Sequence, residues 1–284
     1  MTKYMKGREN GKLRIIPGFG LSVGITLLIL TCIVIVPLTT VVLYAMRVSP
    51  VEFMSILLSE SIRYSIIVSV VCSVVAALIN GFFGFIIAWS LVRYEFRWKT
   101  ILDSLIDIPF AMPTAIAGIT LSKMYSNTGV PGKFLSDVGI NVSYSHSGIV
   151  VAMVFVGVPF VIRNLQPVLE KIDPSYEEAA AIFGVGKTRI FFRIILPEIL
   201  PAWITGVGMS FARGIGEYGS IVYIAGNSAR EHTQVASYII MQRLNNMDYT
   251  SAAVVAVVLL LISIVSLMIS NAVQIMYSRR VKHE

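Results

Sequence analysis

The chain has 284 residues, of which 56% are hydrophobic and 14% charged, with a formal net charge of +7 and a mean hydropathy of +0.78. A soluble domain of this length has no interior large enough for so much apolar surface, so the composition excludes that class and indicates that the bilayer is the solvent. The two cysteines, Cys32 and Cys72, lie in apolar runs without metal-ligand spacing, which excludes a disulfide framework and a cysteine metal site.

Six apolar segments are long enough to cross a membrane, since about 20 helical residues span about 30 Å of hydrocarbon. They predict an all-α polytopic membrane protein with six transmembrane helices. The first segment is too long for the core of a signal peptide and is expected to be retained. Pro109 and Pro113 predict that the third span is kinked or partly re-entrant. The predicted spans are 21–45, 64–91, 105–125, 148–162, 202–226 and 250–276.

Lysine and arginine are distributed unevenly among the connections between these spans. Sixteen lie in the two tails and in the loops after the second and fourth spans, against six in the opposite connections. Because cytoplasmic connections carry the excess of positive charge, both termini and the loop 163–201 are predicted to be cytoplasmic. The net charge therefore reports topology, and no nucleic-acid partner is expected. The N-terminal tail contributes Lys3, Lys6, Arg8, Lys12 and Arg14.

The fourth connection is predicted to contain a capped helix, for which two start signals are present. In the first, Asp173 caps the helix and Pro174 takes its first position. In the second, Ser175 and Glu178 form a capping box. Gly184 then predicts the end of the helix. A second amphipathic segment follows, with apolar residues at Ile190, Phe191, Ile194 and Ile195.

Two interpretations of this connection are open on local physics. Its small alanines, flanked by Phe183 and Phe191, suit a helix that docks in a groove of a protein partner. The alternative is an interfacial helix on the lipid head groups, which is typically basic on its polar face. Glu177 and Glu178 at the helix start favour the protein partner.

Two glycine motifs resemble nucleotide-binding patterns in residue order but not in structural context. Gly186-Lys187-Thr188 matches the end of a phosphate-binding loop, but Ala181 stands where that pattern needs its first glycine. Gly214-x-Gly216-x-x-Gly219 matches a dinucleotide fingerprint, but it lies in an apolar span, where glycines serve close helix packing. We therefore expect no ATP site on this chain. His146, His232 and His283 have no companions at metal-ligand spacing, so no metal site is expected either.

The pattern Glu178-Ala179-Ala180, Gly184 and Ile194-x-Leu196-Pro197 resembles the EAA loop of the membrane subunits of ATP-binding-cassette (ABC) importers. Two further stretches, 107–118 and 216–227, resemble the T-type subunit of the sulfate/thiosulfate permease family. The resemblance implies the type I importer permease fold, in a single domain 1–284 with its core at about 62–272. It also implies that the loop docks in a cleft of the ATPase. The implied coupling residues are Glu178, Ala179, Ala180, Gly184, Ile194, Leu196 and Pro197.

The resemblance further implies a transport subunit, not an enzyme, in a bacterial inner membrane. Its implied partners are a second, non-identical permease subunit, two ATPase subunits and an external sulfate-binding protein. ATP and magnesium would be used by the ATPase, with no cofactor on this chain and no catalytic residue. Candidate hydrogen-bond donors for the anion are Thr114, Ser210, Ser220 and Asn227.

Arg213 and Glu217 are the clear charges within a predicted span, four residues apart and therefore on one helix face. Either Arg213 helps an oxyanion to cross, or the two form a structural pair or bridge to a partner subunit. The structural pair is favoured, because Glu217 would cancel most of the attraction of Arg213 for sulfate. Two other functions stay open: a molybdate or tungstate ABC permease, and a stand-alone secondary anion transporter. The absence of a detectable inverted repeat disfavours the secondary transporter.

Overall fold

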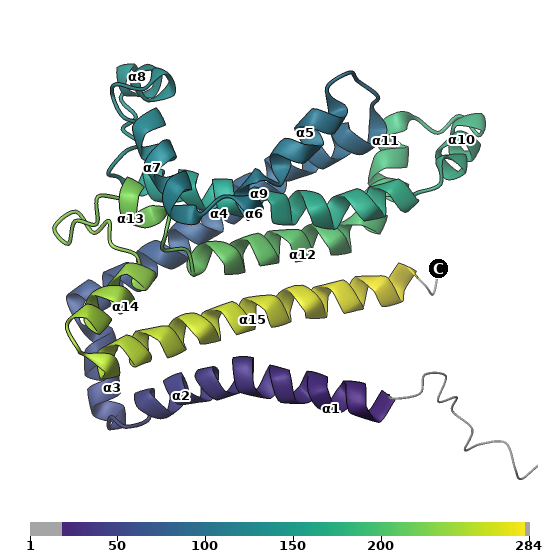
Figure 1. The fold of residues 1–284 in the computed structure, drawn as a ribbon. Coiled ribbons are helices and arrows are strands. Elements are labelled where there is room, and N and C mark those ends of the chain that lie inside the picture. Colours follow the sequence, from purple (N-terminus) through teal and green to yellow (C-terminus); the bar gives the residue numbers. More distant parts are fainter. Residues whose placement is uncertain (1–18, 282–284) are drawn as a thin grey trace, which may run out of the picture.

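The computed structural model describes residues 19–281, and every regular element within that range is helical. Five helices of the described chain are long and apolar enough to cross a membrane, and one bent pair provides a sixth candidate span. The all-α, six-span prediction is therefore confirmed. Long helices run side by side between two ends of the molecule, with α10 at one end and α8 and α13 at the other (Figure 1). The predicted basic N-terminal tail, Lys282 and His283 lie outside the described residues.

The first span is one continuous helix built from α1 (Phe19–Leu30), the π-helical turn η1 (Thr31–Ile35) and α2 (Val36–Ala45). No residue in its most apolar window is buried, and α2 alone packs against the rest of the chain, along α15. A helix that is apolar all round needs cover from lipid or from another protein. The short helix α3 (Pro50–Leu58), capped by Ser49, leads into the second span.

The core is formed where α4 (Glu60–Arg93), α9 (His146–Lys171) and α12 (Leu196–Ile215) pack together. Small residues permit the close approach, as expected where lipid tails give helices no hydrophobic drive to associate. At Gly84 an added Cβ would lie 2.9 Å from the Val161 side chain. Helix α9 continues through Pro159 and Pro167 to Lys171, so the predicted fourth span, 148–162, was too short. Neighbouring helices cover the backbone there, which makes the prolines tolerable.

The third span is broken, as its two prolines predicted. It consists of α5 (Lys99–Ile106), α6 (Ile108–Ala111) and α7 (Thr114–Met124), and the chain bends by 113° between the α5–α6 arm and α7. The two arms rise from α6 like a V, with α6 resting on α9 (Figure 1). Helix α8 (Val130–Asp137) follows α7 at the end opposite α10.

The fifth span differs from the prediction at both ends. Helix α10 (Pro174–Ile182) is followed by α11 (Lys187–Ile190), the π-helical turn η2 (Phe191–Ile195) and α12, and the last three form one helix of 29 residues. It ends at Ile215, so the expected span 202–226 began too late and ended too late. Pro197 and Pro201 lie inside the helix, and the apolar stretch after Gly216 is largely irregular apart from α13 (Ile221–Ile224).

The chain closes with α14 (Ala236–Asn245) and α15 (Tyr249–Val281). Helix α15 runs back across the molecule and ends on the same side as α10 and the start of α1 (Figure 1). All five long helices therefore connect the same two ends of the bundle. The connection 172–186 is what remains of the predicted loop 163–201, because α9 and the fifth span take up its flanks.

Candidate functional site

Helix α10 begins at a side-chain cap. Asp173 Oδ1 accepts a hydrogen bond of 2.9 Å from the backbone N–H of Ser175, and Pro174 occupies the first turn. Of the two predicted start signals, the one with Asp173 as cap is correct. The hydrogen bonds from the Ser175 backbone and hydroxyl lower the pKa of Asp173, so this carboxylate stays charged at the positive end of the helix.

A left-handed glycine ends α10. Gly184 has φ +75°, its N–H donates to Ala181 O at 2.9 Å, and the N–H of Val185 donates to Ala180 O at 3.1 Å. This pair of bonds is the Schellman arrangement, which needs a residue that tolerates positive φ. No atom lies within 4 Å of a Cβ added at Gly184. The glycine is therefore required for its backbone conformation and not for space.

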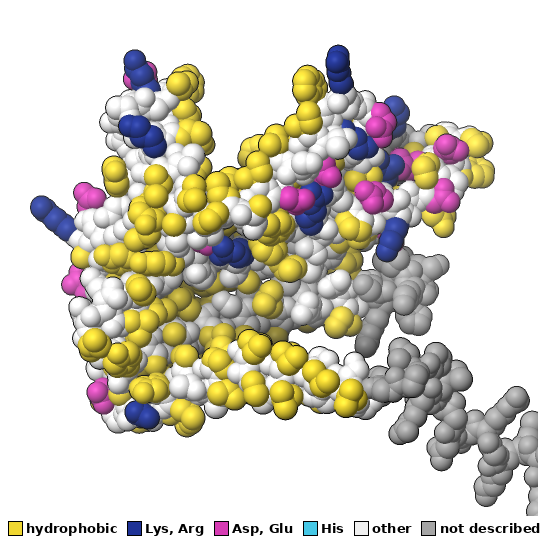
Figure 2. Space-filling model, viewed as in Figure 1, with side chains coloured by type: hydrophobic (Ala, Val, Ile, Leu, Met, Phe, Trp, Pro, Cys, Tyr) yellow, Lys and Arg dark blue, Asp and Glu magenta, His cyan; other side chains and the backbone are white. Residues whose placement is uncertain are grey.

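One face of α10 is held to the body of the protein and the other is free. On the held face, Glu177 Oε1 lies 2.7 Å from Arg93 Nη1 at the end of α4, and Ala180 packs against the apolar cluster around Leu169. Glu178 and Ala179 are exposed. Ile182 is 84% exposed and Phe183 86% exposed, so the helix ends in an uncovered apolar tip. Hydrophobic and acidic side chains gather at this end of the molecule (Figure 2).

The second half of the pattern lies in the long helix and is packed. Ile194 and Leu196 are partly buried against the same cluster as Ala180. The ring of Phe191 meets Trp89 edge-on with centroids 5.5 Å apart. Of the seven predicted coupling residues, Glu178 and Ala179 are thus exposed, Gly184 follows the end of the helix, and the others are at least partly buried.

Arg213 and Glu217 form an ion pair, although the helix predicted to carry both ends at Ile215. Arg213 Nη1 lies 2.5 Å from Glu217 Oε2, with the Arg213 side chain 34% exposed and that of Glu217 2% exposed. The other carboxylate oxygen accepts from the backbone N–H and the hydroxyl of Ser220, both at 2.9 Å. Every acceptor of this buried carboxylate is engaged, which is the pattern of a structural group.

The two stretches that carried the sulfate-permease resemblance meet in space. A Cβ at Gly118 would collide with the Ser220 backbone, and one at Gly219 with Thr114 Oγ1. Both stretches are places where a helix breaks. Irregular backbone within the membrane is tolerated where protein buries it or where it lines a water-filled cavity, so this junction, α7 against the 216–220 turn, is a candidate element of the pathway.

Three of the four predicted hydrogen-bond donors take part in hydrogen bonds within the protein, Ser210 as an acceptor. Ser210 Oγ accepts from Asn80 Nδ2 at 2.9 Å. Ser220 Oγ donates to Glu217 Oε1 at 2.9 Å, and Asn227 Nδ2 donates to Val222 O at 2.7 Å. Ser210 and Ser220 are buried. Thr114, next to Gly219, lies at the junction itself.

Sequence reasoning missed a polar cluster around Arg163, which had been assigned to a loop. Arg163 binds both carboxylate oxygens of Asp107, at 2.8 and 2.6 Å, and Asp103 Oδ1 at 2.7 Å. Gln166 donates to the same Asp103 oxygen at 3.0 Å. The cluster fastens α5 and the α5–α6 junction to α9, and so fixes one arm of the V. In the sequence, Asp107, two residues before Pro109, was the signal for this cluster.

Replacing Arg163 with Lys should loosen this arm, because an ammonium group cannot reproduce the two-pronged contact with Asp107. The free energy of unfolding in detergent should fall by about 1–2 kcal/mol. Arg243→Lys is the matched control, since Arg243 makes one longer contact of 3.3 Å to Asp248 with a similarly exposed side chain. Equal thermal shifts in the two variants would contradict the clamp.

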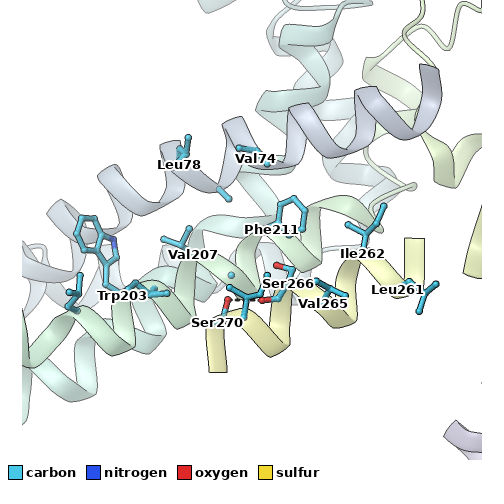
Figure 3. A pocket seen from close by; sticks show the side chains of 15 residues that line it. Val74, Leu78, Trp203, Val207, Phe211, Leu261, Ile262, Val265, Ser266 and Ser270 are labelled. Carbon is cyan, nitrogen blue, oxygen red and sulfur yellow. Dashed lines mark hydrogen bonds between the residues drawn. The ribbon is translucent and has the colours of Figure 1, made fainter. Parts of the chain in front are cut away.

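An apolar groove of about 740 Å³ lies between α4, α12 and α15. Figure 3 shows Val74 and Leu78 on one side of it, with Trp203, Phe211 and Val265 among the other lining residues. Two of its polar side chains bond within the protein: Ser270 Oγ donates to Ser266 O at 3.0 Å, and Trp203 Nε1 donates to Gly81 O at 2.8 Å. The groove is suited to a hydrocarbon chain, and its lining has no charged residue that could bind an anion.

A comparison with known protein families identifies the family of this chain. Residues 80–283 match the family described as binding-protein-dependent transport system inner membrane component. The chain belongs to this family. It is therefore an inner-membrane permease component of an ABC transport system, and a transport subunit instead of an enzyme.

Curated relatives cover nearly the whole chain. The sulfate transport system permease protein CysT of Salmonella typhimurium is 41% identical over 268 residues, which is 94% of this chain and 96% of the relative. The protein of the same name from Escherichia coli gives the same identity and coverage. That of Synechocystis is 36% identical over 88% of this chain and 87% of its own.

Solved structures show the fold of this permease. A bacterial ABC transporter that imports the acidic polysaccharide alginate has a TM-score of 0.74 at 15% identity, covering 90% of this chain and 95% of its own. The MetNI methionine ABC transporter in inward-facing conformations has a TM-score of 0.54 at 18% identity, covering 78% and 99%. The ABC importer permease fold expected from the sequence is therefore confirmed.

Proposed function

We propose that this permease is the membrane-spanning subunit of an ATP-driven sulfate or thiosulfate importer, in which it forms half of the pathway. The observation that carries the substrate is the 41% identity, over 94% of the chain, to proteins named as sulfate transport permeases. A lower sequence identity to these relatives would support the fold but not the substrate. The stretches 107–118 and 216–227 support the same assignment, because they meet at the one junction where two helices break.

Coupling to a cytoplasmic ATPase would pass through α10. Ile182 and Phe183 expose apolar surface at its tip, and burying such surface stabilises a complex by about 25 cal/mol per Å². Glu178 and Ala179 stand on the same free helix, where a small residue lets a partner approach. ATP and magnesium would belong to that partner, and the packed residues Ile194, Leu196 and Pro197 would carry the motion onward.

The assembly would place both termini and α10 in the cytoplasm of a bacterial cell, with the whole chain as one permease domain. A second, non-identical permease subunit, two ATPase subunits and an external sulfate-binding protein complete it. The first span has no buried residue in its most apolar window, which supports a neighbour in the membrane. Sulfate is doubly charged and costly to desolvate, and Glu217 already neutralises Arg213, so neutral donors along the pathway would carry much of the selectivity.

Competition for uptake tests the substrate. Proteoliposomes with the complete assembly should accumulate radiolabelled sulfate only with internal ATP, and unlabelled thiosulfate should compete at least tenfold better than molybdate. Preferred uptake of molybdate by an assembly with two copies of this chain would support the molybdate alternative. Uptake that follows an ion gradient and survives removal of the ATPase would support a secondary transporter.

A further inference from the structure

A pocket of about 330 Å³ lies at the end of the molecule opposite α10. Four segments of chain build it: α7, the turn after it, the segment before α9, and α13. Five of the seven lining residues carry a hydroxyl group, and one carries a positive charge. The lining residues are Ile119, Ser122, Lys123, Ser126, Thr128, Tyr144 and Tyr223.

The pocket is positive because its one charged residue is a lysine. Lys123 makes no ion pair with any residue between 19 and 281, and no carboxylate belongs to the lining. Ser126 Oγ donates to Lys123 O at 2.8 Å and lies 2.9 Å from Thr128 Oγ1, so these two hydroxyl groups bond within the protein. The Lys123 ammonium group and the hydroxyl groups of Ser122, Tyr144 and Tyr223 are left to donate hydrogen bonds to one small anion.

The last carbonyls of α7 would repel an anion if they were free, but the chain occupies them. Leu121 O accepts from the Tyr125 N–H at 2.9 Å, Ser122 O from Ser143 Oγ at 2.9 Å, and Lys123 O from Ser126 Oγ at 2.8 Å. These bonds occupy three of the last four carbonyls of α7 and so weaken the negative end of this helix next to the pocket.

The wall of the pocket is held in a strained conformation. Tyr144 has φ +61°, a left-handed backbone that costs about 1–2 kcal/mol for a residue other than glycine. Its N–H donates to Ile224 O at 2.7 Å, and a Cβ at Gly226 would lie 3.1 Å from the Tyr144 Cβ. The fold thus fixes the backbone of Tyr144 next to α13, which carries Tyr223. Strain that is kept by its surroundings in this way gathers at binding sites.

Helix α7 connects the pocket to the junction of the two broken helices. Lys123 lies near its outer end, and Thr114, at its other end, contacts Gly219. Nine residues of helix separate the two, which is roughly 14 Å. An anion bound at Lys123 would therefore lie one length of α7 away from the junction where the two helices break.

We propose that this outer pocket binds a tetrahedral oxyanion, sulfate in the transport cycle, before it enters the pathway. This inference rests on the proposed function for the identity of the anion. A phosphate group of a lipid headgroup shares the same chemistry, so the experiment must separate the two sources.

Protection from labelling measures binding without transport. A Thr128→Cys variant, in a chain whose Cys32 and Cys72 are replaced by Ser and Ala, is assembled with its partners in nanodiscs and treated with a membrane-impermeant maleimide. Sulfate at about four times its dissociation constant should slow the reaction about fivefold, and chloride at equal ionic strength should not. Adding Lys123→Gln should remove the protection. Protection that survives Lys123→Gln would overturn the proposal.

The lipid composition of the nanodisc distinguishes the sources. In zwitterionic phosphatidylcholine, which carries no net charge, sulfate should protect as strongly as in mixtures with anionic phosphatidylglycerol. Labelling that is slow without sulfate, and slower still as phosphatidylglycerol is added, would assign the pocket to a lipid and overturn the proposal.

Transport in the native-cysteine chain provides a second readout. With sulfate-loaded binding protein below saturation, Lys123→Gln should lower ATP-driven uptake about fivefold, whereas Lys123→Arg should stay within about twofold. Lys133→Gln, which changes an exposed lysine on α8 outside the lining, should leave uptake unchanged, and an equal loss in that control would overturn the proposal. Wild-type protein that takes up no sulfate would contradict the proposed function, whereas normal uptake without protection would contradict this inference alone.

Discussion

Sulfate uptake should fall at least tenfold in a Gly184→Val variant while ATP hydrolysis by the assembly continues. Gly184 has φ +75°, and a β-branched residue held there costs about 2 kcal/mol, so α10 would end differently. Since about 1.4 kcal/mol shifts an equilibrium tenfold, few assemblies would keep the native helix end. Uptake and ATPase rates, measured on the same proteoliposomes, check this uncoupling.

Two matched variants separate backbone strain from side-chain size. Gly184→Asn should retain much of the uptake, because asparagine tolerates the left-handed conformation. Gly186→Ala should be nearly silent: Gly186 also has open space around it, but its φ is −67°. If Gly184→Val takes up sulfate at the wild-type rate, the end of α10 has no part in coupling.

Arg213→Met should remove most of the folded protein from the membrane. The substitution leaves the Glu217 carboxylate, only 2% exposed, without its cation, and an unpaired buried charge costs about 3–5 kcal/mol. The yield of monodisperse protein in detergent measures the loss. Glu217→Gln should be milder, because the amide oxygen can still accept from Ser220 and the Arg213 side chain is 34% exposed.

The double variant Arg213→Met with Glu217→Gln decides between a structural and a transport role for the pair. It removes both charges together and keeps an acceptor for Ser220, so folded protein should return to near the wild-type amount. We expect uptake to return with it, since Glu217 neutralises Arg213 in the native protein. A double variant that folds well but transports nothing would show that Arg213 acts on the anion.

Local signals explain which parts of the structure were predictable. The start and end of α10 depend on Asp173 and Gly184, residues that fix backbone conformation within a few positions, and both were predicted correctly. The apolar runs likewise predicted the spans, because hydrophobic length alone determines what can cross a bilayer.

Features that depend on tertiary packing were not predictable in the same way. The long helix ends at Ile215 inside an apolar stretch, so hydropathy could not mark the break. Arg163 was counted with a loop because its partners, Asp103 and Asp107, lie about 60 residues earlier in the chain. The charge pair was predicted from helical spacing, and it forms for another reason: the turn after Gly216 brings Glu217 back to Arg213.

The continuous helix from Lys187 to Ile215 can transmit a movement from one end of the permease to the other. Its 29 residues extend roughly 43 Å, from the connection after α10 to the turn that holds Glu217. A tilt of about 5° about the end next to α10 would displace the far end by roughly 4 Å, and the tight contacts of Gly118 and Gly219 would carry α7 along. Under the proposed function, a small rotation of an ATPase surface docked on α10 would thus become a larger movement at the far end of the helix.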